Sequence, residues 1–197
     1  MMPKRSFETV SEFEKHTRQA EELIFDGTEN PTERPKNNDK QKSKYSGKKK
    51  THTDIAMVLS DKKTWIYYVS QLYDGSNVDM GILKKEFTPG QGWFKKYRMF
   101  FDLGFVGVEK IYKIKEVVIG KKKPRKSKNN PKPELSKEQK AQNKKVSSER
   151  IFVEHAIGKM KIFRVLKNRC RFKCPIIKNK IIGVCAGLWN HKLSMKS

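Results

Sequence analysis

The sequence predicts one α/β domain that is built on a mixed sheet with helices on its faces. The chain has 197 residues, a length that suits a single domain. Short apolar runs that end in turn residues come first, and longer stretches with helical spacing of apolar residues follow. Hydrophobic residues make up only 36% of the chain, so the core must be small and the surface strongly charged.

The first half of the chain reads mainly as strands. Residues 23–25 form an apolar run that ends at an Asp-Gly pair, which is typical of a strand followed by a turn. Residues 52–59 and 64–72 are rich in β-branched and aromatic residues, and the polar segment between them predicts an antiparallel hairpin. Residues 78–87 are expected to form a short helix.

The second half begins with strands and ends with helices. Residues 99–101 and 116–119 are further short strands. The basic tract 121–147 contains prolines in its first half and lacks apolar runs, so we expect a mobile loop there. A long helix should begin near Ser147-Ser148, whose hydroxyl groups suit an N-cap, and residues 181–193 should form a last helix.

The charge of the chain limits its partners. Lys and Arg number 45 against 21 Asp and Glu, which gives a net charge of +24 and favours binding to DNA, RNA or an anionic membrane. No apolar run is long enough to span a membrane, and no secretory signal follows the first residues. Three cysteines indicate a reducing compartment, and their spacing does not match a structural zinc site.

Two carboxylates share one context. Asp26 and Asp102 each follow a short apolar strand and precede a glycine by one or two positions. If the two strands are parallel neighbours, both side chains lie at one edge of the sheet, where ligands bind in α/β folds. Each aspartate alone could simply form a turn. Beside DNA, however, paired carboxylates are useful when they hold metal ions that reverse the local charge.

A third acid would complete a metal site, and Glu154 is our candidate. Arg150, Glu154 and Lys161 are separated by steps of four and seven, which place them on one side of a helix. The alternative is an ordinary Arg150–Glu154 ion pair on a solvated surface. Asp79, which follows a Gly-Ser turn, is the rival third acid.

Together these segments resemble the catalytic domain of a DDE transposase, in the bacterial insertion-sequence group related to the eukaryotic Harbinger transposases. The resemblance runs almost from end to end, and its most specific string is Tyr-Ser-Gly-Lys-Lys-Lys-Thr-His-Thr. The segments that carry it are residues 23–29, 45–53, 75–79, 102–107 and 143–161.

The resemblance implies a ribonuclease H-like fold over residues 1–197 and a reaction that depends on Mg²⁺, for which Mn²⁺ can substitute. That reaction is phosphodiester hydrolysis at transposon ends, followed by transfer of the 3′-OH into target DNA. The metal-ligand positions fall on Asp26, Asp102 and Glu154. The positions that contact DNA fall on Lys48, Lys49, Lys50, His52, Arg150 and Lys161.

The resemblance also sets expectations for the whole protein. DNA is the expected partner, with room for a homodimer on DNA, and the expected location is the bacterial cytoplasm at the nucleoid. Asp26 lies near the start, whereas related proteins usually carry an upstream helix-turn-helix region, so we expect a truncated or frameshifted copy. The alternatives are a catalytically inactive DNA-binding remnant and a basic ribosome-associated protein. The metal-ligand triad discriminates, because a binding module has no use for three converging acids and a ribosomal protein should avoid them near RNA.

Overall fold

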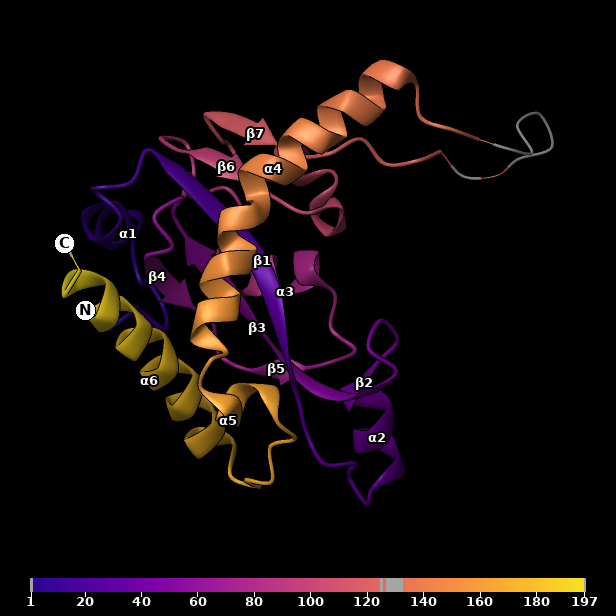
Figure 1. Cartoon of the computed structure of the whole chain (residues 1–197), viewed down its shortest axis with the longest axis vertical. Helices are drawn as coiled ribbons and strands as arrows, with labels where there is room; N and C mark the ends of the chain where they lie inside the picture. The colour runs from indigo at the N-terminus through magenta and orange to yellow at the C-terminus, as the bar shows by residue number, and fades with distance from the viewer. Residues whose placement is uncertain (1, 125, 127–132, 197) are drawn as a thin grey trace.

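The computed structural model describes residues 2–124, 126 and 133–196, and it contains a mixed seven-stranded sheet (Figure 1). The main path of the sheet is β2-β3-β1-β6-β7, and β4 and β5 also pair with β3. The strands are β1 (Glu22–Pro31), β2 (Tyr45–Ser46), β3 (Thr51–Ser60), β4 (Ile66–Val69), β5 (Tyr73–Asp74), β6 (Arg98–Phe100) and β7 (Glu116–Val118). The predicted α/β class and the predicted hairpin, now β3 and β4, are confirmed.

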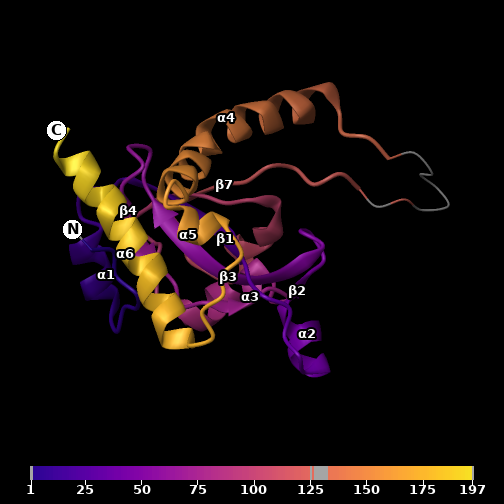
Figure 2. The same ribbon diagram turned by 60° about the horizontal axis from the view of Figure 1, so that its bottom comes forward.

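Helices cover both faces of the sheet (Figure 2). They are α1 (Val10–His16), α2 (Asn38–Lys44), α3 (Asp79–Glu86), α4 (Lys137–Met160), α5 (Arg164–Lys167) and α6 (Pro175–Ser194), with short 3₁₀ turns η1 (Leu103–Phe105) and η2 (Val108–Lys110). Met57 of β3 packs in one core with α1 and α3, and Val58 packs in the other with α4 and α6. Alternating residues of β3 therefore serve two cores, which explains its nearly continuous apolar run. None of the described helices combines the length and apolar character that a membrane span requires.

The strand that carries Asp26 and the strand that precedes Asp102 are parallel neighbours, which is the condition for both side chains to lie at one edge of the sheet. Leu23 of β1 pairs with Met99 of β6, and Ile24 pairs with Phe100, where β6 ends. The predicted turn at Asp26-Gly27 is wrong, because β1 continues to Pro31 alongside antiparallel β3. The partner strand supplies hydrogen bonds along this whole length, so the chain remains extended through the Asp-Gly pair.

Residues 137–147 of the basic tract are helical, which corrects the prediction of a loop over 121–147. Helix α4 begins at a capping box formed by Ser136 and Gln139, not at Ser147. The Lys, Glu, Gln and Ala residues that follow are strong helix formers, so helix propensity outweighs the repulsion between lysines. Figure 1 shows this first half of α4 extending beyond the sheet. Residues 125 and 127–132 of the same tract lie outside the described residues.

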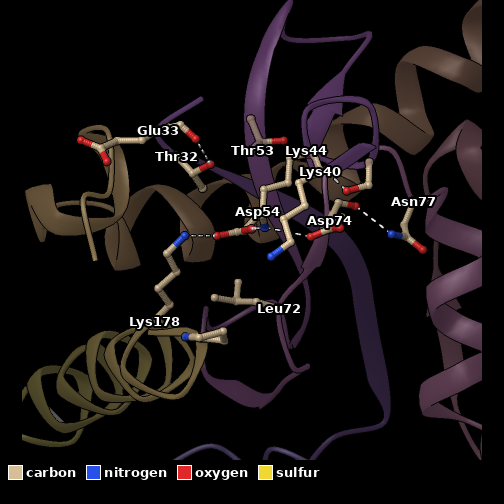
Figure 3. A network of polar contacts seen from close by, with 12 residues as sticks. Thr32, Glu33, Lys40, Lys44, Thr53, Asp54, Leu72, Asp74, Asn77 and Lys178 are labelled. Carbon is tan, nitrogen blue, oxygen red and sulfur yellow. Dashed lines mark hydrogen bonds and ion pairs between the residues drawn. The ribbon is translucent and has the colours of Figure 1, made fainter. Parts of the chain in front are cut away.

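A network of charges joins elements that are distant in sequence (Figure 3). Asp54 of β3 is buried, and its carboxylate accepts hydrogen bonds from Lys44 of α2 and from Lys178 of α6, the latter at 2.9 Å. Lys44 also donates to Asp74 of β5 at 2.8 Å. Burial alone would lower the pKa of Lys44, but its hydrogen bonds to the two carboxylates raise the pKa above its ordinary value.

Helix α6 also caps the edge of the sheet at β4. The backbone N–H of Ile66 donates to the side-chain oxygen of Asn190 at 2.9 Å, and the Asn190 amide donates back to the Ile66 carbonyl at 2.7 Å. One buried side chain therefore satisfies both backbone groups of an edge residue that would otherwise need water or another strand.

Replacing Asp54 by Asn should destabilise the fold, because Lys44 and Lys178 would lose the buried carboxylate between them. We expect a loss of about 3 kcal/mol in the free energy of unfolding, measured by urea denaturation. The matched variant Asp74→Asn should lose less than about 1 kcal/mol, because that carboxylate is 40% exposed and Lys44 keeps Asp54. Equal losses in the two variants would contradict a central role for Asp54.

Candidate functional site

A hollow of about 570 Å³ lies beside the second half of β1, beyond the point where β6 ends. We call it the β1 hollow. Asp26, Gly27 and Glu29 of β1 form one side. The other sides are formed by the turn between β2 and β3, by residues 75–79 before and at the start of α3, and by Gly104 in η1.

Arg150 of α4 joins the two predicted aspartates. Its guanidinium donates to the Asp102 carboxylate at 3.1 Å and lies 3.5 Å from the Asp26 carboxylate. The Nε atom of Arg150 is buried and has no hydrogen-bond partner among the described residues. Two strands and a helix therefore bring a pair of carboxylates together around one cation.

Asp79 lies in the same hollow, between the two glycines that follow the aspartates. A Cβ atom added to Gly27 would lie 3.0 Å from one oxygen of the Asp79 carboxylate, and one added to Gly104 would lie 3.0 Å from the other. A side chain at either position would therefore crowd this carboxylate and require it to shift. Sequence reasoning took these glycines as turn residues, although their recurrence after both aspartates was the signal for a close approach.

Negative charge is crowded in the β1 hollow. Burial raises the pKa of Asp26 to about 6, although Arg150 and the Gly27 backbone N–H oppose the shift and Asp102 and Asp79 add to it. Burial also raises the pKa of Asp79, where Lys48 opposes the shift. Additional positive charge, beyond that of Arg150 and Lys48, would stabilise the ionised carboxylates of Asp26 and Asp79.

Helix α4 presents a second basic residue to β1. The ammonium group of Lys161 donates to the backbone carbonyl of Glu29 at 2.6 Å. Burial, together with the nearby charge of Lys49, lowers the pKa of Lys161 to about 8. Arg150 and Lys161 thus both reach β1 from one side of α4, as their spacing indicated.

Glu154 lies one turn after Arg150 on the same helix, and it is exposed. Within the described part of the chain its carboxylate forms no hydrogen bond or ion pair with another side chain. The structure brings Asp26, Asp102 and Asp79 close together, and it leaves Glu154 outside this group.

The predicted DNA-contacting lysines form the exposed turn between β2 and β3. Lys48 lines the β1 hollow, and Lys49 lies near enough to Lys161 to lower its pKa. Lys50 adopts a positive φ of 54°, which lets the chain turn back into β3. The ring of His52 packs against that of Tyr45 with centroids 5.7 Å apart.

The donor set of the hollow fits a hard divalent cation. No group of three or more His, Cys, Asp or Glu side chains among the described residues is placed to hold a metal ion. Asp26 and Asp102 nevertheless offer carboxylate oxygens on neighbouring strands, and Mg²⁺ is commonly held by one or two carboxylates together with substrate phosphates and waters. The gap that Gly27 and Gly104 leave for Asp79 adds a further oxygen donor.

Comparison with known proteins identifies relatives of the chain. A family model described as "DDE superfamily endonuclease" matches residues 25–190. The chain is 32% identical over 177 residues to a Microchaete diplosiphon protein described as a probable transposase for insertion sequence element IS702. The aligned part covers 89% of this chain and 58% of that relative, so the chain spans little more than half of the relative's length. No solved structure matches the chain significantly.

The raised pKa of Asp26 predicts a pH-dependent stability. Between pH 3.8 and about 6 the folded protein retains a proton that the unfolded chain has released, so the free energy of unfolding falls as pH rises through this range. Asp26→Asn has no charge to bury and leaves Arg150 paired with Asp102. We expect this variant to be more stable than wild type by about 1–3 kcal/mol above the folded-state pKa of Asp26.

The measurement is urea unfolding of the wild type and Asp26→Asn across this pH range. The gain should shrink toward zero near pH 3.8, where Asp26 of the unfolded chain is also protonated. Glu8→Gln, which changes an exposed carboxylate, serves as the control and should follow the wild type. If Asp26→Asn also had the stability of the wild type at every pH, the charge of Asp26 would not be buried.

Proposed function

Because the chain belongs to the DDE superfamily of endonucleases, we propose that the β1 hollow cuts DNA at the ends of an insertion sequence and joins the freed 3′-OH to target DNA. The observation that carries this proposal is the Asp26–Arg150–Asp102 group, which lies just past the point where the parallel pairing of β1 and β6 ends. The mixed sheet with helices on both faces supports a ribonuclease H-like fold for this domain.

In this proposal Asp26, Asp102 and Glu154 hold divalent metal, with Mg²⁺ as the working ion and Mn²⁺ as a substitute. When bound, such an ion makes a water molecule a stronger nucleophile and stabilises charge on the leaving 3′ oxygen. The aspartates provide the negative charge that holds the ion beside DNA phosphates. Arg150, which now neutralises both aspartates, is then available to contact a phosphate near the scissile bond.

Glu154 is the third acid in this proposal because of its place on α4. Arg150 of α4 and Lys161, which follows its last residue, both reach β1, and Glu154 is four residues from one and seven from the other, so we place it on that side of the helix. It has no described partner that would hold it away from the hollow. Asp79 is the second candidate, supported by its position between Gly27 and Gly104.

The rim of the hollow would bind the DNA backbone. Lys48, Lys49 and Lys50 are exposed in one turn, and Lys161 lies close to Lys49. Phosphate oxygens placed among these ammonium groups would relieve their mutual repulsion, and they would raise the lowered pKa of Lys161. His52 at the base of the same turn would lie beside the DNA.

A catalytically inactive DNA-binding remnant is the second candidate function. The observation that favours it is that Arg150 sits between Asp26 and Asp102 while Glu154 stands apart. Such a protein would keep the basic rim and lose the chemistry, so binding and cleavage have to be measured separately.

The first test is cleavage of DNA that carries the insertion-sequence ends, with Mg²⁺ present. Asp26→Asn, Asp102→Asn and Glu154→Gln should each reduce strand nicking to the level seen without metal, because each removes one ligand charge. Asp79→Asn should retain nicking if Glu154 is the third acid. The reverse pattern would assign the third position to Asp79. A wild-type protein that binds DNA without nicking it would support the inactive remnant.

The second test is the salt dependence of duplex binding, measured without metal by fluorescence anisotropy. Each phosphate contact contributes about 0.9 to the slope of log affinity against log salt, so Lys48→Gln/Lys49→Gln/Lys50→Gln should lower the slope by about 2–3. The control is Lys110→Gln/Lys113→Gln/Lys115→Gln, which removes the same charge from exposed positions around Tyr112. This segment lies at the C-terminal end of α3, because the Tyr112 hydroxyl donates to the carbonyl of Phe87, the residue after α3. An equal drop in both variants would show that net charge alone determines binding.

A further inference from the structure

A second hollow, of about 610 Å³, lies between α2 and the beginning of α6. We call it the α2–α6 groove. Residues 32–36 and Lys40 of α2 form one wall, and residues 170–173 with the first turn of α6 form the other. The backbone N–H of Cys170 donates to the Pro31 carbonyl at 2.8 Å, which joins the two walls at one point.

The groove and the β1 hollow share a partition. Lys44 and Asp74, which form an ion pair, line the groove, and the residues that follow them, Tyr45 and Gly75, line the β1 hollow. The partition is thin at this point, because a Cβ atom on Gly75 would lie 2.8 Å from the Lys44 carbonyl oxygen. The two hollows are therefore neighbours, separated at this point by residues 44–45 and 74–75.

The charged side chains on the floor of the groove form ion pairs, whereas those on its walls do not. Asp54 and Asp74 on the floor pair with Lys44 and Lys178. None of the exposed basic residues that line the walls forms an ion pair among the described residues, and Glu33 is the one carboxylate among the described residues that line these walls. The basic wall residues are Arg34, Lys36, Lys40, Arg171 and Lys173.

These unpaired cations face one another across a confined space, so their fields add and attract a polyanion. A gap of this volume is in the range of clefts that hold small ligands, so it suits a single strand better than a duplex. Phe172, between Arg171 and Lys173, lines the groove with 47% of its surface exposed. A basic groove that also presents an aromatic ring is the arrangement that binds single-stranded nucleic acids, because phosphates meet the cations and a base stacks on the ring.

We propose that the α2–α6 groove binds a single strand of DNA that continues from the β1 hollow. The cations of the two walls contact its phosphates, and the Phe172 ring stacks on one base. This inference rests on the proposed function for the choice of DNA, because the chemistry of the groove by itself recognises any single-stranded nucleic acid.

The test measures the affinity for a single-stranded DNA oligonucleotide in EDTA by fluorescence anisotropy. Arg171→Glu/Lys173→Glu should reduce this affinity about tenfold or more, and it should lower the salt slope by about 0.7 for each lost phosphate contact. Phe172→Ala should reduce the affinity about fivefold or more through the loss of stacking. Lys110→Glu/Lys113→Glu makes the same charge change at exposed positions outside the groove and should bind several-fold more tightly than the groove variant.

The outcomes separate this inference from the proposed function. Failure of the wild type to bind the oligonucleotide, or equal losses in the groove variant and its control, would overturn the groove whether or not the protein nicks DNA. Wild-type affinity in Phe172→Ala would remove the stacking contact from the proposal. If the oligonucleotide binds as expected but the protein never nicks DNA with Mg²⁺, the binding role of the groove stands and the proposed catalysis is rejected. Thermal unfolding of each variant confirms that the exposed substitutions leave the fold intact.

Discussion

Strand β1 has β3 beside it over most of its length, whereas β6 accompanies only its first residues. The second half of β1 is therefore paired on one side and open on the other, and the β1 hollow occupies this opening. Asp26 lies just past the last β1–β6 pair, so its carboxylate emerges beside Asp102, which comes shortly after the last residue of β6. A β6 that continued would close the opening and separate the two acids.

Helix α4 completes this arrangement from above the sheet. Val153, Ala156 and Met160 are buried, and they fix the helix in rotation. The same rotation directs Arg150 to the two aspartates and Lys161 to the carbonyl of Glu29. Apolar packing on one part of the helix surface thus positions the charged groups beside it. In a chain with a net charge of +24, the β1 hollow is a small acidic region, where burial, with a smaller contribution from Asp102 and Asp79, raises the pKa of Asp26.

The sequence predicted what depends on local pattern. The hairpin and the shared side of Arg150 and Lys161 follow from apolar runs and residue spacing. Prediction from the sequence was wrong where a long-range contact determines the structure. Gly27 looked like a turn residue, because nothing local shows that the carboxylate of Asp79 needs its space. The α2–α6 groove was also missed, since it exists only where residues 32–36 meet residues 170–174.

The network around Asp54 imposes an order on biosynthesis. A ribosome makes β3 and Lys44 early, but Lys178 and Asn190 belong to the last helix. Until α6 has left the exit tunnel, Asp54 lacks one of its two cations and the edge of β4 lacks its cap. A nascent chain in that state exposes an apolar sheet face and an open strand edge, the features that lead to aggregation and that chaperones recognise. The domain can therefore reach its final packing only once α6 is available to close over the sheet.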